Sequence, residues 1–116
     1  EVAALLGPVG RVVGPDDLAS VMAGAELIVN ATSLGMGTDG AVPLEVALLR
    51  PEHVVVDIIY RPLVTPLLAA ARATGCRSAN GISMLVHQAA IAFTHWTGQP
   101  APVEAMTAAV APLLAD

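Results

Sequence analysis

The sequence contains no lysine and few other basic residues. Its 116 residues include 5 arginines against 10 acidic residues, which gives a formal net charge of −5. The arginines are scattered singly, at Arg11, Arg50, Arg61, Arg72 and Arg77. Because nucleic-acid binding needs a basic patch or stripe, this pattern argues against a nucleic-acid partner. A reaction that needs a lysine ammonium would have to take it from outside these residues.

Cysteine is also scarce, since Cys76 is the only one. A single thiol forms neither an internal disulfide nor a metal cluster, so we expect Cys76 to be a small buried residue and the protein to be cytoplasmic. No apolar run reaches about 18 residues without a charged residue, proline or asparagine, and we expect no membrane partner. The spacing of His53, His87 and His95 contains no i,i+4 pair, which argues against a zinc site.

What is present is an apolar chain of the size of one domain. Hydrophobic residues make up 55% and charged residues 13% of the sequence, and the mean hydropathy is +0.70. This is unusually apolar for a free-standing domain of this length. The first residues read as the end of a helix that stops at Gly7 and Pro8, with no start in front of it. We therefore expect a truncated chain that buries surface against a partner or belongs to something larger.

Strand-like and helix-like apolar patterns alternate along the chain, which is typical of βα units in a parallel sheet. We predict strands at 9–13, 26–31, 53–60 and 76–79, and helices at 18–23, 44–49, 67–74, 82–97 and 103–114. The segment 53–60 is the richest in valine and isoleucine and should be central. Asp16 or Asp17 should cap the first helix, and Thr65-Pro66 should begin the helix that ends at Gly75. The predicted class is α/β.

The segment Gly35-Met36-Gly37-Thr38-Asp39-Gly40 matches GxGxxG, the pattern of dinucleotide-binding loops, and Asp57 follows in the next strand. The pattern holds a pyrophosphate only when a helix begins within the glycine loop. Pro43 comes three residues after Gly40 and would clash with such a helix. We therefore interpret this match as a chance occurrence.

Polar residues follow three predicted strands at the point where each ends: Asn30-Ala31-Thr32-Ser33, then Tyr60 after Ile59, then Asn80-Gly81. In a parallel sheet these ends share the carboxyl edge, where ligands of open α/β folds bind. Ordinary turn chemistry explains any one of them taken alone.

The helix 82–97 places a second set of residues at that edge. Gly81, Met84, Leu85 and Gln88 lie on one face within two turns of its start. The opposite face, with Ile82, Val86, Ala89, Phe93 and Trp96, should be core. Met84 could equally be a packing residue, and Gln88 could make a hydrogen bond between domains.

Several separate blocks resemble one family. They are Leu27-Ile28-Val29-Asn30-Ala31-Thr32-Ser33-Leu34-Gly35-Met36, Asp57-Ile58-Ile59-Tyr60 with Thr65-Pro66-Leu67-Leu68, Asn80-Gly81-Ile82-Ser83-Met84-Leu85-Val86-His87-Gln88-Ala89, and 93–98. In their order and spacing they resemble the C-terminal part of shikimate dehydrogenase, within its NADP-binding domain. The resemblance implies a partial Rossmann-like parallel sheet that lacks the first two strands of that domain.

The resemblance also implies an activity, the NADP-dependent reduction of 3-dehydroshikimate to shikimate. Asn30, Ala31, Thr32 and Ser33 would then line the nicotinamide-ribose side of NADP, and the backbone of Gly81 and the side chain of Met84 would hold the nicotinamide. Tyr60 and Gln88 would face the substrate. These are positioning roles, which fix the hydride donor and acceptor in contact range.

The family takes its catalytic lysine and aspartate from an N-terminal substrate domain, so we expect no catalytic residue and no turnover in this chain alone. With strand order 3-2-1-4-5-6, the remaining third to sixth strands would leave a hole in the sheet. We expect a homo-oligomer, formed for example by strand exchange, or a rearrangement in which the strand 9–13 pairs elsewhere.

Three other readings stay open. A quinate-accepting relative shares these motifs. A tetrahydrofolate dehydrogenase or glutamyl-tRNA reductase would share the alternation but should lack the combined Tyr60, Met84 and Gln88 blocks. The isolated chain could also be a non-catalytic, self-associating module.

Overall fold

A three-stranded parallel sheet forms the centre of the molecule. In the computed structural model, which describes residue 5 and residues 7–114, the strands are β1 (Leu27–Asn30), β2 (Val54–Asp57) and β3 (Arg77–Ala79). They lie side by side in chain order, with β2 in the middle. The predicted α/β class and the central position of the segment 53–60 are therefore confirmed.

The two faces of the sheet differ in how far they are covered. Ile28 lies beside Val55 in the register, and this face carries the core, in which Val55 is fully buried. The side chains of Leu27 and Val29 point to the opposite face, because neighbouring residues of a strand alternate. They are 57% and 50% exposed, so the described residues leave the second face at β1 open to solvent.

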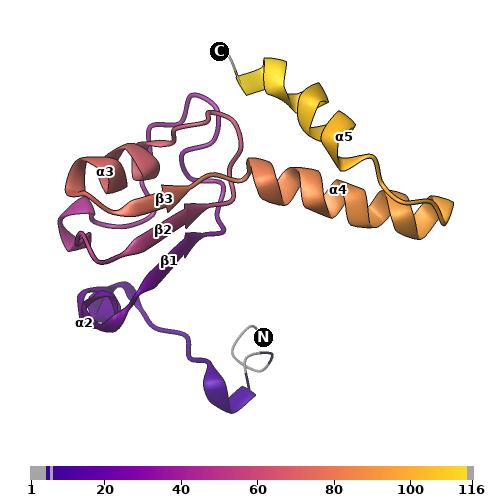
Figure 1. Ribbon diagram of the computed structural model, residues 1–116. Helices are drawn as coiled ribbons and strands as arrows, with labels where there is room; N and C mark the ends of the chain where they lie inside the picture. Colours follow the sequence, from indigo (N-terminus) through magenta and orange to yellow (C-terminus); the bar gives the residue numbers. More distant parts are fainter. Residues whose placement is uncertain (1–4, 6, 115–116) are drawn as a thin grey trace.

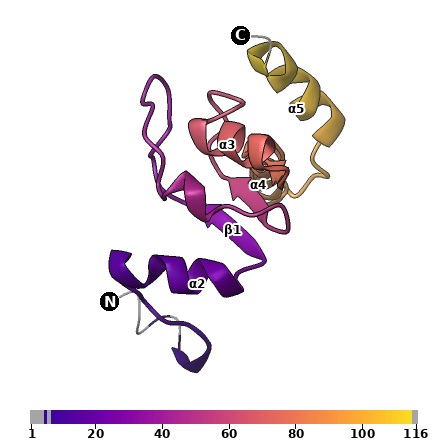
Figure 2. The same cartoon turned by 90° about the vertical axis from the view of Figure 1, so that its left-hand side faces the viewer.

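Within residues 7–114, four α-helices surround or extend from the sheet: α2 (Leu18–Gly24), α3 (Pro66–Thr74), α4 (Ile82–Thr97) and α5 (Val103–Val110). Short 3₁₀ helices occupy Gly7–Val9, Pro15–Asp17, Val46–Leu48 and Ala111–Leu114. Helix α2 lies near the β1 edge, and α3 packs on β2 and β3 (Figures 1 and 2). Helix α4 leads away from the sheet, and α5 folds back along α4. Among these helices, none is long and apolar enough to cross a lipid bilayer.

One cluster of buried apolar side chains joins α2, β2, α3 and the segment before β2. Its members are Met22, Leu49, Val55, Leu67, Leu68, Ala71 and Cys76. Cys76 is 8% exposed, and its thiol donates to the carbonyl of Arg50 over 3.1 Å. The prediction of a buried structural cysteine is therefore confirmed.

His53 has a structural role beside this core and is fully buried. Its Nδ1 accepts the backbone N–H of Arg50 at 3.0 Å, so Nε2 carries the proton and donates to the carbonyl of Met22 at 3.2 Å. Both ring nitrogens are thus satisfied within the core, and the ring links the start of β2 to α2.

The predicted ends of α3 and α4 are confirmed. The Thr65 hydroxyl accepts the backbone N–H of Leu68, Pro66 is the first residue of α3, and Gly75 ends it with φ +88°. Such a left-handed terminus favours glycine because a Cβ would be strained there. Gly98 ends α4 in the same way, with φ +68°.

The predicted strand at 9–13 is wrong. Residues 7–9 form a 3₁₀ helix and the following residues have no strand pairing, with Val9 96% and Val12 64% exposed. A β-branched run becomes a strand only beside a partner strand, and the described residues place none next to it. The sheet consequently has three adjacent strands and no hole. The expected helix before Gly7 lies almost wholly outside the described residues.

One further local prediction is wrong. The segment 44–49 forms only the 3₁₀ turn Val46–Leu48, because Pro51 disfavours helical backbone just before it and leaves too little room for an α-helix. Asp17 does occupy the N-cap position of α2, as predicted, but it makes no capping hydrogen bond with its side chain, because the 3₁₀ turn that contains it runs directly into the helix.

The glycine-rich loop is not a phosphate loop in the described structure. No helix begins within Gly35–Gly40, and the loop is instead closed by Asp39, whose carboxylate accepts the backbone N–H groups of Gly35 at 3.4 Å and Ala41 at 3.0 Å. The described loop therefore does not meet the condition that a helix begins within it.

The arm formed by α4 and α5 leaves apolar surface uncovered. The radius of gyration is 16.6 Å, whereas a compact chain of this length has about 13 Å. Val86 and Ala90 are buried, but Trp96 is 81% exposed, so its prediction as a core residue is wrong. Its end of α4 projects beyond the sheet, where the described residues offer little to pack against it (Figure 1).

We expect Gly81→Ala to destabilise the fold. A Cβ added to Gly81 would overlap the carbonyl of Ile58, which belongs to the backbone and moves aside less easily than a flexible side chain. Overpacking of this kind costs about 1–3 kcal/mol of unfolding free energy, measurable by urea denaturation followed by circular dichroism. Gly40→Ala is the matched control, because a Cβ added there would have nothing within 4 Å. Equal stability of the two variants would contradict the close approach.

Candidate active site

A fully buried carboxylate lies where β2 ends. Oδ1 of Asp57 accepts the Asn30 side-chain amide at 3.2 Å and the Ile59 backbone N–H at 3.0 Å, and Oδ2 accepts the Thr65 hydroxyl at 2.7 Å. Asn30 is the register partner of Asp57 at the end of β1. The carboxylate therefore joins the end of β1, the turn after β2 and the N-terminus of α3.

Asn30 passes this constraint on to the turn that follows β1. Its Oδ1 accepts the backbone N–H of Thr32 at 3.0 Å and the Thr32 hydroxyl at 2.7 Å, while its Nδ2 also donates to the carbonyl of Leu34 at 3.2 Å. The side chain is 4% exposed and lines neither of the cavities described below. Asn30 thus holds the turn by buried hydrogen bonds, whereas Thr32 and Ser33 in the same turn line a cavity.

A first cavity opens at the carboxyl edge between the segments that follow β1 and β2. Its volume is about 490 Å³. Its lining residues are Ala31, Thr32, Ser33, Met36, Gly37, Ile58, Ile59, Tyr60 and Arg61. Three of the four residues predicted on the nicotinamide-ribose side are therefore on one wall, and Tyr60, which is 50% exposed, is on the other.

A second cavity of about 280 Å³ adjoins the first between the end of β2 and the start of α4. Its lining residues are Ile58, Tyr60, Gly81, Met84, Leu85 and Gln88. The two cavities share Ile58 and Tyr60. Residues that follow β1 and β2 and one face of the start of α4 therefore line adjoining cavities, with Tyr60 common to both, whereas Asn30 and Asn80 line neither.

The start of α4 is held tightly against β2. The N–H of Gly81 donates to the carbonyl of Ile59 at 3.0 Å. The carbonyl of Ile58 occupies the place that a Cβ of residue 81 would need. Oδ1 of Asn80 accepts the N–H of Ile82 at 3.3 Å. These contacts fix the position of the first turns of α4, and with them Met84 and Gln88, relative to the strand ends.

The chemistry of the two cavities is that of binding and orientation. Their walls are mostly apolar, with hydroxyls from Thr32, Ser33 and Tyr60 and an amide from Gln88. Arg61 supplies the one formal charge among the lining residues. No histidine, aspartate, glutamate or lysine lines either cavity, so the described residues offer neither a carboxylate nor an imidazole as a general base there.

Sequence reasoning missed the central role of Asp57, which it weighed only as part of a dinucleotide fingerprint, and it did not single out Arg61. A usable signal was present for Asp57. A charged residue inside an otherwise apolar central strand has to be compensated, and Thr65 eight residues later is a donor that can do so.

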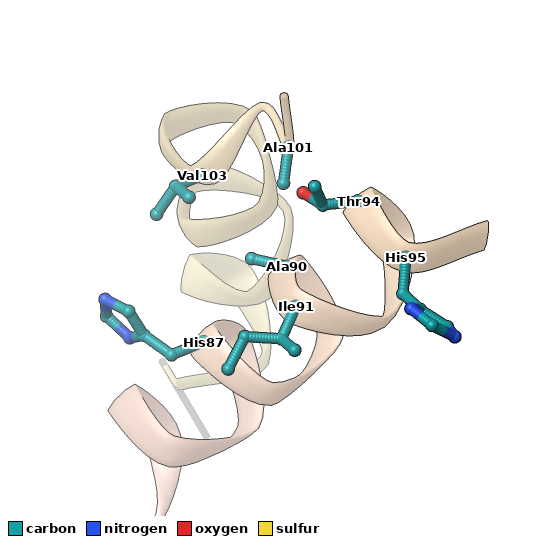
Figure 3. Close-up of a pocket in the computed structure, with 7 residues that line it drawn as sticks. All are labelled: His87, Ala90, Ile91, Thr94, His95, Ala101 and Val103. Atoms are coloured by element: carbon teal, nitrogen blue, oxygen red, sulfur yellow. The ribbon is translucent and has the colours of Figure 1, made fainter. Parts of the chain in front are cut away.

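A further hollow of about 560 Å³ lies between α4 and α5 (Figure 3). Its lining residues are His87, Ala90, Ile91, Thr94, His95, Ala101 and Val103. Figure 3 shows the two imidazole rings pointing away from each other, and the described residues contain no cluster of three metal-ligating side chains. This hollow shares no lining residue with the cavities at the sheet edge.

We expect Asp57→Asn to lower the unfolding free energy by about 2–3 kcal/mol, because an amide replaces a buried carboxylate that three donors address. Amide resonances of Thr32 and Leu34 should shift together with the loss, since Asn30 links them to Asp57. Asp16→Asn, in an exposed turn, is the control and should change neither readout. A stable variant with unmoved Thr32 and Leu34 resonances would contradict the network.

Comparison with known proteins shows which family this chain is similar to. Residues 81–111 match the family profile described as Shikimate 5'-dehydrogenase C-terminal domain. The chain is 50% identical over 82 residues to the shikimate dehydrogenase (NADP(+)) of Rhodopseudomonas palustris, an alignment that covers 71% of this chain and 30% of that protein. The chain spans about a third of the length of the curated relatives it matches.

Solved structures of related dehydrogenases are similar to this chain as well. Quinate dehydrogenase from Corynebacterium glutamicum in complex with NAD superposes with a TM-score of 0.75 at 39% identity, covering 82% of this chain and 34% of that one. Shikimate 5-dehydrogenase from Thermus thermophilus in complex with NADP(H) and shikimate gives a TM-score of 0.72 at 37% identity, covering 85% and 36%. The chain belongs to the shikimate dehydrogenase family and corresponds to the C-terminal part of its members.

Proposed function

We propose that this chain forms the nicotinamide side, and part of the substrate side, of an NADP-dependent shikimate dehydrogenase that interconverts 3-dehydroshikimate and shikimate. The observation that carries this proposal is the pair of adjoining cavities that meet at Tyr60. The Thermus structure in complex with NADP(H) and shikimate supports the binding of both ligands.

The cofactor side consists of Ala31, Thr32, Ser33, Met84 and the backbone of Gly81. Bound NADP supplies the hydride chemistry. The Ser33 hydroxyl offers hydrogen bonds to a ribose, whereas the Thr32 hydroxyl already donates to Asn30 and accepts the N–H of Leu34, which leaves it one lone pair as an acceptor. The Met84 side chain, 58% exposed, offers a polarisable apolar surface to a flat ring. Asn30 acts indirectly, because its side chain is buried and holds the Thr32 turn.

The substrate side consists of Tyr60 and Gln88. A phenol hydroxyl and a carboxamide can both donate and accept hydrogen bonds, which suits the hydroxyls and carboxylate of shikimate. Since Tyr60 borders both cavities, it would hold the substrate next to the nicotinamide. Fixing the two reacting carbons in contact is the main contribution that these residues make to the rate.

We propose further that proton transfer is performed by groups outside this sequence. The sequence holds no lysine, and the lining residues of both cavities include no carboxylate or imidazole. In the family that this chain resembles, a lysine and an aspartate of the N-terminal substrate domain have that role. The chain alone should therefore bind without turning over.

Quinate is the second candidate substrate. The structure of quinate dehydrogenase from Corynebacterium glutamicum superposes on this chain as well as the shikimate-bound structures do. Quinate and shikimate share a carboxylate and ring hydroxyls, and Tyr60 and Gln88 can bond to either.

The chain is further proposed to self-associate and to work in the cytoplasm. Among the described strands, β1 and β3 each have one edge without a neighbouring strand, and Leu27 and Val29 are exposed on the open face. Uncovered edges and apolar faces of this kind are sites of association.

We expect the purified chain to bind NADPH weakly and saturably, as followed by the fluorescence of the reduced nicotinamide. Met84→Ala should weaken this binding several-fold, whereas Met106→Ala on α5, outside both cavities, should leave it unchanged. NADP and shikimate together should give no NADPH. Turnover would refute the assignment of proton transfer to outside groups, and absence of saturable binding would refute the proposed cofactor site.

In size-exclusion chromatography with light scattering, we expect more than one copy per particle at micromolar concentration. Val29→Lys should shift the population toward monomer, because it places a charge on the open face, and Val12→Lys, in the exposed segment before α2, is the control. A compact monomer at every concentration would contradict the association.

A further inference from the structure

Arg61 occupies a distinctive position at the carboxyl edge. It directly follows Tyr60, it is exposed, and it lines the same cavity as Thr32 and Ser33. Its backbone carbonyl accepts the N–H of Gly37 at 3.1 Å, which fastens the segment after β2 to the loop after β1. The residue is therefore anchored at its backbone while its side chain is free to meet a ligand.

The described residues provide no acidic partner for the Arg61 guanidinium. The ion pair they form joins Arg50 to Glu52 at 3.9 Å, far along the chain from this edge. The carboxylates in the two segments that flank this cavity are already engaged, since Asp57 accepts three hydrogen bonds inside the protein and Asp39 accepts two backbone N–H groups of its own loop.

The other arginines lie elsewhere. Arg50 donates to the carbonyls of Met22 and Ala23, Arg72 donates to the Ser78 hydroxyl, Arg77 begins β3 at the amino edge of the sheet, and Arg11 precedes α2. Arg61 is thus the one positively charged residue among those that line the two cavities, and it lines the first of them. The chain as a whole has a formal net charge of −5.

A guanidinium presents a planar fork of N–H donors that matches the two oxygens of a carboxylate or phosphate. Both ligands of the proposed reaction carry such groups: the dinucleotide has phosphates and the substrate has a carboxylate. In an otherwise acidic chain, an anionic ligand gains most from positive charge placed inside the cavity it enters.

We propose that Arg61 is an oxyanion-binding residue of this site, which pairs with a phosphate of the dinucleotide or with the carboxylate of the substrate. This inference rests on the proposed function and adds to it the residue that selects for charge in the ligand. It assigns Arg61 to binding and orientation, with no part in proton transfer.

The test compares the whole chain with Arg61→Gln, using ligands that differ only in charge. One pair is reduced nicotinamide mononucleotide and reduced nicotinamide riboside, which lacks the phosphate. The other pair is shikimate and its methyl ester, which lacks the carboxylate charge. Dissociation constants come from titrations followed by amide NMR shifts. Arg77→Gln, which removes an exposed arginine at the opposite edge of the sheet, is the matched control.

We expect Arg61→Gln to weaken binding of one charged ligand by about tenfold to a hundredfold and to leave its neutral counterpart unchanged. Loss confined to the mononucleotide identifies the phosphate as the partner, and loss confined to shikimate identifies the carboxylate. Arg61→Lys should restore part of the affinity, because it keeps the charge without the planar fork.

Unchanged affinities, or equal losses for charged and neutral ligands, would overturn the role of Arg61 while leaving the proposed function standing. If the wild-type chain binds none of the four ligands, the proposed function fails and this inference fails with it.

Discussion

The fold of the site depends on one buried charge. Removing a carboxylate from water is costly unless donors replace its hydration. Asp57 meets that condition with a side-chain amide from the end of β1, a hydroxyl from the first residue before α3 and a backbone N–H from its own turn. Each donor belongs to a different segment, so the carboxylate is satisfied only when all three segments are in place. Local order at the carboxyl edge is thereby tied to the stability of the sheet.

Because of this arrangement, some residues support the carboxyl edge from inside and others line its cavities. Asn30 and Thr65 are buried and bonded to Asp57, whereas Thr32 and Tyr60, two or three residues from a member of the network, line the cavities. Rigid support behind an exposed binding surface lets a binding site hold its geometry before the ligand arrives. The tight seat of Gly81 on β2 extends the same support to the first turns of α4.

Local sequence signals predicted the ends of helices correctly. They failed for features that depend on a neighbouring element, such as strand pairing and burial. Thr65 caps its helix with its own hydroxyl, and Gly75 and Gly98 end theirs with a left-handed backbone, so these signals are local and their helices were predicted correctly. The segment 9–13 has the composition of a strand, but a strand exists only beside another. Trp96 was assigned to the core because apolar spacing does not reveal whether anything covers that face. The side-chain direction of Asn30, inward to Asp57, depended on a register that the sequence does not state.

The attachment of α4 at Gly81 also determines which parts of the molecule can adapt. The helix begins at a point fixed on β2 and extends for 16 residues, or about 24 Å, with α5 resting on its outer part. A tilt of about 10° around that pivot would carry the far end through roughly 4 Å but would displace Met84, one turn away, by less than about 1 Å. A displacement of the outer end of α4 would therefore reach the cavity-lining first turns only in strongly reduced form.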